Sequence, residues 1–166
     1  DTSVMPGVQG GPLMHVIAAK AIAFGEALKP NFITYAQSII SNAKLMAEEL
    51  MDMDYKLITG GTDTHVILID LSNKNISGKK AEFILGKAGI TVNKNMVPFD
   101  TKSPFVTSGI RIGTPAITTR GMGKEEIKQI AFWIDKAIKN SDDDSVLSNI
   151  KKDVNHLCSD FPIHKH

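Results

Sequence analysis

The hydrophobic positions in the first third of the chain repeat at helical spacing. Apolar side chains recur every three or four residues from Leu13 to Leu28, and Lys29-Pro30 is expected to end this first helix. A second helix is predicted over residues 31–53, and its apolar stripe consists of Tyr35, Ile39, Ala43, Met46 and Leu50. Because a proline separates the two helices, we expect a hinge there, with one domain ending at residue 28 and another spanning residues 29–166.

The pattern then changes to alternating strands and helices. In chain order, we expect strands at 55–58 and 65–71, a helix at 77–87, a strand at 90–92, a strand around Arg111, and helices at 124–139 and after 144. Gly60-Gly61 is typical of a turn between strands, and Ser77 of a helix N-cap. This order predicts an α/β or α+β fold in which helices cover one small sheet.

Residues 93–107 have neither helical nor strand periodicity. A connection of this length inside a compact domain is usually functional or disordered. The segment contains asparagines, prolines and phenylalanines, a composition that is rigid and aromatic rather than flexible. We therefore expect a binding loop.

The candidate chemistry centres on Arg111, one of only two arginines in the chain. A guanidinium is a planar fork that binds a carboxylate or phosphate through two parallel hydrogen bonds. The segment around it is expected to be a buried strand, and Gly109 and Gly113 are expected to let a small ligand approach the backbone. A structural ion pair is the alternative interpretation of the same arginine.

A second candidate anion site is the glycine pair that precedes the first helix. Gly10 and Gly11, followed by Pro12 in the expected first turn, would leave backbone amides free at a helix N-terminus, where a phosphate can bind. An ordinary tight turn is the alternative. The glycine spacing is neither that of a dinucleotide fingerprint nor that of a P-loop.

Composition argues against several other classes of protein. A formal net charge of +1 with scattered lysines gives no reason to expect a nucleic-acid partner, and no apolar run approaches the length of a membrane span. No group of His, Cys or carboxylates has metal-site spacing. The single cysteine, Cys158, fits a reducing compartment, and we expect a cytoplasmic protein. The residues alone thus indicate an anion-binding domain without a complete catalytic set.

Four segments carry a more specific signal. They read VQGGPLMH at residues 8–15, GGTDTH at 60–65, ITVNKN at 90–95 and TSGIRIGTPA at 107–116. In this order and spacing they resemble the C-terminal part of the serine hydroxymethyltransferase family.

The resemblance implies a pyridoxal 5'-phosphate enzyme of fold type I, the aspartate-aminotransferase-like fold. Such an enzyme interconverts L-serine and tetrahydrofolate with glycine and 5,10-methylenetetrahydrofolate, as a homodimer or a dimer of dimers. Residues 1–28 would be the end of the large cofactor-binding domain with the interdomain helix, and residues 29–166 the small domain.

The resemblance also implies roles for individual residues. Arg111 would bind the carboxylate of the amino-acid substrate. Gly10 and Gly11 would reach the cofactor phosphate of the neighbouring subunit. The folate site would be lined by Asn95, Ser103, Pro104 and Phe105.

The chain departs from the family pattern in one respect. The family lysine that holds the cofactor lies in a Thr-rich His-Lys motif upstream of the glycine segment, and no such motif is present. We therefore expect an enzyme fragment that is inactive alone and holds no catalytic residue. Two alternatives stay open: another fold-type I pyridoxal-phosphate aldolase, against which the folate segment argues, and a non-catalytic module that pairs with other chains.

Overall fold

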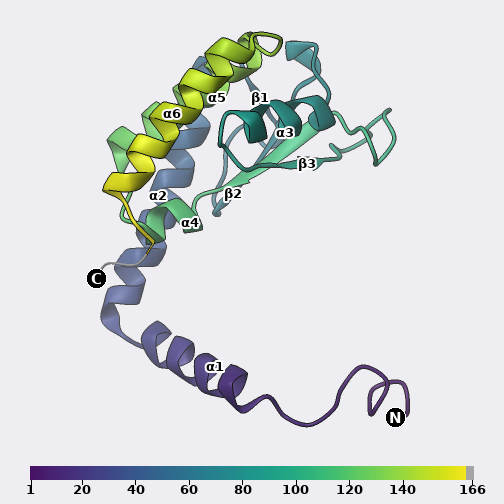
Figure 1. Cartoon of the computed structure of the whole chain (residues 1–166), viewed down its shortest axis with the longest axis vertical. Helices are drawn as coiled ribbons and strands as arrows, with labels where there is room; N and C mark the ends of the chain where they lie inside the picture. Colours follow the sequence, from purple (N-terminus) through teal and green to yellow (C-terminus); the bar gives the residue numbers. More distant parts are fainter. Residues whose placement is uncertain (164–166) are drawn as a thin grey trace. The chain divides into compact units, whose positions relative to one another are not determined.

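The computed structural model describes residues 1–163 and divides into two compact units between Ala36 and Gln37 (Figure 1). The first unit contains helix α1 (Met14–Ala27) and the start of α2 (Pro30–Asp52). No residue of α1 is buried. The domain boundary expected after residue 28 stays a prediction, and residues 164–166 of the expected second domain lie outside the described residues.

The two long helices begin and end close to where the sequence predicts. The first helix ends at Ala27, before Lys29-Pro30, and Pro30 is the first residue of α2, where its missing N–H costs no hydrogen bond. The buried residues of α2 are Asn42, Ala43, Met46, Ala47 and Leu50. They confirm the C-terminal half of the predicted stripe.

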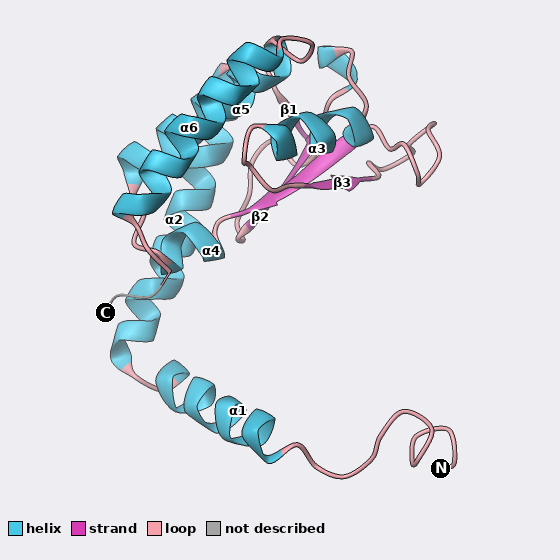
Figure 2. Ribbon diagram, viewed as in Figure 1, coloured by secondary structure: helices cyan, strands magenta, loops and turns pink. Residues whose placement is uncertain are grey.

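The second unit is built on a four-stranded antiparallel sheet with strand order β1-β2-β4-β3 (Figure 2). The strands are β1 (Lys56–Leu57), β2 (Val66–Asp70), β3 (Asn93–Asn95) and β4 (Gly109–Gly113). The turn predicted between β1 and β2 is confirmed, since Gly60 and Gly61 both have positive φ angles, of 66° and 149°. This α/β arrangement confirms the predicted fold class.

One predicted strand is misplaced. Residues 90–92 are not in the sheet; the strand is Asn93–Asn95, which pairs with β4. Val92 is buried and Ile90 packs against the core, so their apolar character reflects packing under the helices rather than strand pairing. The strand itself is polar because it forms the edge of the sheet.

Helices pack against one face of the sheet and form the core with it. They are α2, α3 (Gly78–Lys87), α5 (Lys124–Lys139) and α6 (Asp144–Asp160), and α5 contacts α6 along its length (Figure 2). The sheet contributes Ile67, Ile69 and Ile110, each at most 1% exposed. Ser77 caps α3 as predicted, because its hydroxyl accepts a hydrogen bond from Lys80 N at 3.2 Å. A short helix that was not predicted, α4 (Pro115–Thr119), follows β4.

Candidate functional site

Arg111 lies on the face of the sheet opposite the core. Successive residues of a strand point to opposite faces, so Ile110 packs into the core and Arg111 is exposed. In the sheet register, Arg111 lies between Leu68 of β2 and Asn93 of β3. Within residues 1–163 its guanidinium has neither an ion-pair nor a hydrogen-bond partner. The described chain therefore lacks the acid that a structural ion pair would need, and the expectation of a buried strand is wrong at Arg111 itself.

A hollow of about 560 Å³ lies on the same side of the sheet, and Arg111 is not among the residues that line it. Its walls are the turn between β1 and β2 and two residues of β2, namely Thr59, Gly60, Gly61, Thr62, Asp63, Thr64, Val66 and Leu68. Leu68 is the cross-strand neighbour of Arg111, so the hollow and the guanidinium share one side of the sheet. The turn is ordered by its own hydroxyl groups: Thr62 Oγ1 donates to Val66 O at 2.7 Å, and Thr59 Oγ1 donates to Gly61 O at 2.6 Å.

The acid that lies nearest in the sheet register is already occupied. Asp70 pairs in register with Gly109, and its carboxylate binds Lys56 Nζ at 3.1 Å and Ser72 N at 2.9 Å. Burial by itself raises the pKa of Asp70, but the hydrogen bonds from Ser72 and Lys56 outweigh it and bring the pKa below its ordinary value. Asp70 is therefore charged and neutralised locally, which leaves Arg111 free for a ligand.

The two glycines that flank Arg111 differ in the space around them. A Cβ atom at Gly109 would lie 2.5 Å from Ile69 O and 2.7 Å from a methyl carbon of Val97. A Cβ at Gly113 would lie 3.3 Å from His65 O. Gly109 is buried and enclosed by the protein, so the expectation of ligand approach is wrong there. Gly113 is exposed, and ligand approach at it stays a prediction. Gly109 instead lets β4 pack closely against its neighbours.

The predicted folate segment forms the connection between β3 and β4. Asn95 ends β3, and its side-chain amide donates to Met96 O at 2.7 Å. Ser103, Pro104 and Phe105 are exposed on the loop, and the Phe105 side chain is 81% exposed. The loop therefore joins the strand that carries Asn95 directly to the strand that carries Arg111.

The end of this loop is fixed to the beginning of α3. Gly78 N donates to Thr107 O at 3.0 Å, and Lys79 N donates to Val106 O at 2.9 Å. These are amides of the first helical turn, which have no partner within the helix. The loop thus satisfies donors that α3 leaves open, and in return it is held against the body of the domain.

Comparison of the sequence with known proteins identifies a family. The family model described as serine hydroxymethyltransferase matches residues 1–134. A curated serine hydroxymethyltransferase of Coxiella burnetii (strain CbuG_Q212) is 54% identical over 165 residues, which cover 99% of this chain and 39% of that relative. The chain belongs to the serine hydroxymethyltransferase family. It spans well under half the length of the relative, and the family inferred from the four sequence segments is confirmed.

The glycine pair that we predict to bind a phosphate lies in the first unit. Gly10 and Gly11 are exposed, and no atom lies within 4 Å of a Cβ position at either of them. Helix α1 begins at Met14, so Pro12 precedes the helix instead of occupying its first turn as expected. The N-cap, Leu13, provides no side-chain hydrogen bond. The backbone around the pair is therefore accessible to a phosphate group, which fits the cofactor of this family.

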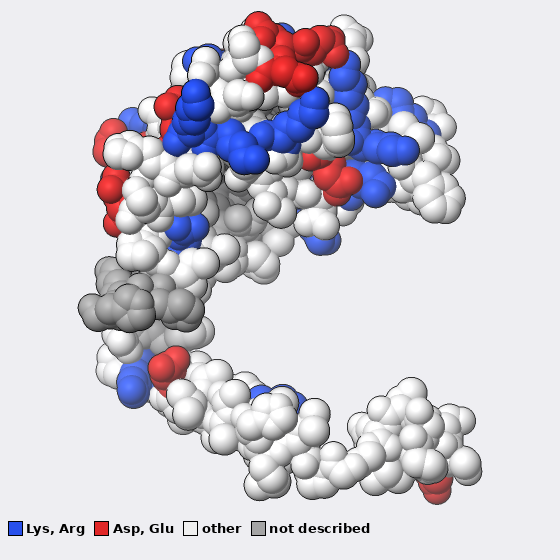
Figure 3. Space-filling view, in the orientation of Figure 1, with Lys and Arg blue, Asp and Glu red and all other residues white. Residues whose placement is uncertain are grey.

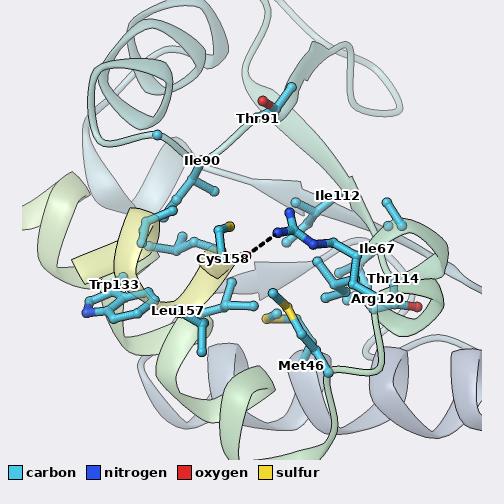
Figure 4. A pocket seen from close by; sticks show the side chains of 18 residues that line it. Met46, Ile67, Ile90, Thr91, Ile112, Thr114, Arg120, Trp133, Leu157 and Cys158 are labelled. Atoms are coloured by element: carbon cyan, nitrogen blue, oxygen red, sulfur yellow. Dashed lines mark hydrogen bonds between the residues drawn. The ribbon is translucent and has the colours of Figure 1, made fainter. Parts of the chain in front are cut away.

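The second arginine lines a different cavity, on the core side of the sheet. This cavity has a volume of about 290 Å³, and Ile67 and Ile112 are among its mostly apolar walls (Figure 4). Arg120 Nε donates to Phe161 O at 2.6 Å, and its Nη2 donates to Cys158 O at 2.8 Å. Arg120 is thus bound to the carbonyls at the end of α6, where a cation is favourable. None of the predicted site residues lines this cavity.

Two lysines of α3 and one of β3 are paired with acids. Figure 3 shows lysines beside the acidic turn between α5 and α6. The pairs are Lys80–Asp142 at 3.0 Å, Lys87–Asp144 at 2.8 Å and Lys94–Glu82 at 3.6 Å. Within the described residues, no cluster of His, Cys, Asp or Glu could hold a metal ion, and no helix is long and apolar enough to span a membrane.

Sequence reasoning missed one residue of the loop, Asp100. Its carboxylate accepts hydrogen bonds from both ends of the connection between β3 and β4. Hydrogen bonds from Lys102 and Ser108 hold its pKa far below the ordinary range of an aspartate. An aspartate in a proline-containing loop is a signal for a side-chain-stabilised turn. Nothing in the sequence indicated that the same carboxylate would also bind residue 108.

Proposed function

We propose that this chain is the substrate-carboxylate and folate-binding part of a serine hydroxymethyltransferase. The complete enzyme would interconvert L-serine and tetrahydrofolate with glycine and 5,10-methylenetetrahydrofolate, as a homodimer or a dimer of dimers. The main support is Arg111, a cation on the open face of the sheet, whose cross-strand neighbour Leu68 lines a hollow and which has no acid partner among the described residues.

The role proposed for Arg111 follows from the geometry of its side chain. A free guanidinium can hold both oxygens of the substrate carboxylate, which fixes the amino acid's position and its rotation. Because β4 is hydrogen-bonded on both sides, the backbone that carries Arg111 is rigid. The residue would therefore orient the bond to Cα that is broken in the reaction.

The role proposed for the loop is to bind the folate. Phe105 offers an exposed ring on which the flat ring system of folate can stack. Asn95, Ser103 and Pro104 lie on the same connection between β3 and β4. Together with Phe105 they would form one wall of the folate site, which we call the folate wall. Because the loop runs into the strand of Arg111, the two substrates would be held next to each other.

The role proposed for Gly10 and Gly11 is to bind the phosphate of pyridoxal 5'-phosphate held by the neighbouring subunit. Their open backbone supports this, because an anion can approach amides that no side chain covers. The cofactor would supply the electron sink of the reaction. We assign none of the lysines in this chain to holding it, and we expect the chain alone to be inactive.

The experiment that tests this function replaces Arg111 in the complete enzyme. Arg111→Ala is expected to weaken serine binding by about 2–4 kcal/mol, the range for removing one partner of a buried charge pair. Arg111→Lys keeps the charge but loses the planar guanidinium, so its affinity for serine should lie between that of the wild type and that of Arg111→Ala. Serine affinity is measured by spectral titration, and wild-type affinity in Arg111→Ala would refute the assignment. A wild-type enzyme that converts serine without tetrahydrofolate would point to an aldolase instead.

A further inference from the structure

The loop between β3 and β4 is organised around one carboxylate, that of Asp100. Its Oδ2 accepts hydrogen bonds from Val97 N at 3.3 Å and from Ser108 N at 2.8 Å. Its Oδ1 accepts from Lys102 N at 2.9 Å and from Ser108 Oγ at 2.7 Å. The donors come from the beginning, the middle and the end of the loop. One side chain therefore ties the whole connection together.

This arrangement requires a carboxylate rather than an amide. All four partners are donors, and both oxygens of an ionised aspartate accept. An asparagine would turn its NH₂ group either toward Val97 N and Ser108 N or toward Lys102 N, so at least one backbone N–H would lose its acceptor. Hydrogen bonds to an ionised acceptor are also about twice as strong as those between neutral groups.

The bonds of Asp100 enclose the two strained positions of the loop. Phe99 and Thr107 have φ angles of 58° and 57°, in the left-handed region that residues other than glycine seldom adopt. Phe99 lies between Val97 and Lys102, whose amides Asp100 binds, and Thr107 directly precedes Ser108. Strained conformations persist only where the surroundings hold them, and they are frequent at ligand-binding sites.

We propose that Asp100 is the positioning residue of the folate wall. By holding the loop closed at both ends, it sets where Ser103, Pro104 and Phe105 stand relative to β4. This inference rests on the proposed function, because it takes these residues as the folate wall. Their side chains are exposed, so the loop backbone is what determines their position.

The effect should be confined to the folate side of the site. Arg111 is held by its strand, which pairs with β2 over five residues and with β3 over three, independently of Asp100. Loss of the Asp100 bonds would therefore displace the loop without displacing the residue proposed to bind serine. A general loss of structure would instead weaken the binding of both substrates, tetrahydrofolate and serine.

The test is a set of variants in the complete enzyme. Asp100→Asn is expected to raise KM for tetrahydrofolate about tenfold, the size of effect that the loss of hydrogen bonds to a charged group produces, and to leave KM for serine within about twofold. Ser108→Ala removes one of the four bonds and should raise the tetrahydrofolate KM less. Asp153→Asn, on the exposed side of α6, is the control for loss of one negative charge and should change neither value.

Hydrogen exchange gives a readout that does not depend on activity. In Asp100→Asn the amides of Val97, Lys102 and Ser108 should exchange faster, whereas those of β2 and β4 should not change. An unchanged tetrahydrofolate KM, or an equal rise in both KM values, would overturn the positioning role. If Asp100→Asn does not fold, Ser108→Ala and Asp100→Glu are used in its place. A wild-type KM for tetrahydrofolate in both variants overturns the positioning role of Asp100. A raised KM for tetrahydrofolate in either variant, with a normal KM for serine, supports it.

The two proposals fail in different ways. A wild-type enzyme without tetrahydrofolate-dependent conversion of serine would overturn the proposed function, and the folate role of Asp100 with it. An active wild-type enzyme in which Asp100→Asn and Ser108→Ala keep the normal tetrahydrofolate KM would overturn only the inference about Asp100.

Discussion

The two arginines of this chain lie close together in sequence and have opposite surroundings. Arg111 points away from the core and has no partner within the described residues, whereas Arg120 lines a core-side cavity and donates to two backbone carbonyls at the end of α6. Both are guanidinium groups with the same charge. What separates them is the use of their donors: those of Arg120 are taken up by the fold, and those of Arg111 are left for a ligand.

The two faces of the sheet differ in the same way. The core face of the two central strands carries isoleucines, of which Ile67, Ile69 and Ile110 have almost no exposed surface. The open face carries Arg111, the Lys56–Asp70 pair and a hollow beside Leu68. In an antiparallel sheet one face can stabilise the domain while the other remains available for binding. Arg120, which the fold binds, and Arg111, for which we propose a ligand, follow this division.

Arg120→Ala, compared with Arg111→Ala, gives the largest effect expected on the fold itself. Removing Arg120 leaves the carbonyls of Cys158 and Phe161 without their charged donor, and we expect a loss of about 1–3 kcal/mol in the free energy of unfolding. Arg111→Ala removes an exposed side chain that has no partner among residues 1–163, and it should change the free energy of unfolding by less than about 0.5 kcal/mol. Urea unfolding of the 166-residue chain measures both. Equal destabilisation by the two variants would contradict the difference proposed between Arg120, which stabilises the fold, and Arg111, which does not.

The sequence predicted most of the fold because the long amphipathic segments are unambiguous. The helix over Lys124–Lys139 is an example: its apolar stripe is matched by burial of Ile127, Ile134 and Ile138. The strand at the sheet edge failed for the opposite reason. Asn93–Asn95 carries no apolar alternation, so only its pairing with β4 defines it. Local pattern cannot reveal an element that tertiary contacts create.

The candidate site was predictable in its residues and less so in its geometry. Arg111 was singled out by its rarity and its flanking glycines, yet the reason given for Gly109 was wrong. The close contact of that position with Ile69 O is a long-range fact of strand packing. Asp100 was missed because its partners Val97 and Ser108 are brought together only when the loop closes.

Phe105→Ala should distinguish the proposed folate-binding role of the loop from the proposed carboxylate-binding role of Arg111. Loss of the exposed ring is expected to weaken tetrahydrofolate binding by about 1 kcal/mol, the typical worth of an aromatic pair, and to leave glycine binding unchanged. Phe83→Ala is the matched control, because Phe83 is an exposed ring on α3, outside the loop and outside the predicted folate residues. Isothermal titration of the complete enzyme gives both affinities. Equal losses of folate and glycine in Phe105→Ala would argue against the folate assignment.

The smallest expected effect concerns the other end of the helix that Arg120 binds. Asp143 caps the N-terminus of α6: its carboxylate accepts from Ser145 N at 2.9 Å and Val146 N at 3.2 Å. Hydrogen bonds from Ser145 and Val146 lower the pKa of Asp143. A carboxyl group whose pKa is lower in the folded state stabilises the fold fully above its unfolded pKa of about 3.9, and this contribution is lost as the pH falls through the folded value.

Asp143→Asn tests this contribution, because asparagine is also a good N-cap but does not titrate. The wild-type chain should therefore lose slightly more stability than Asp143→Asn between about pH 6 and pH 3. The comparison is made by thermal unfolding across this range, and identical pH profiles would contradict the assignment. Acid should thus loosen α6 from the end that an aspartate caps, while the end that the arginine binds keeps its partner.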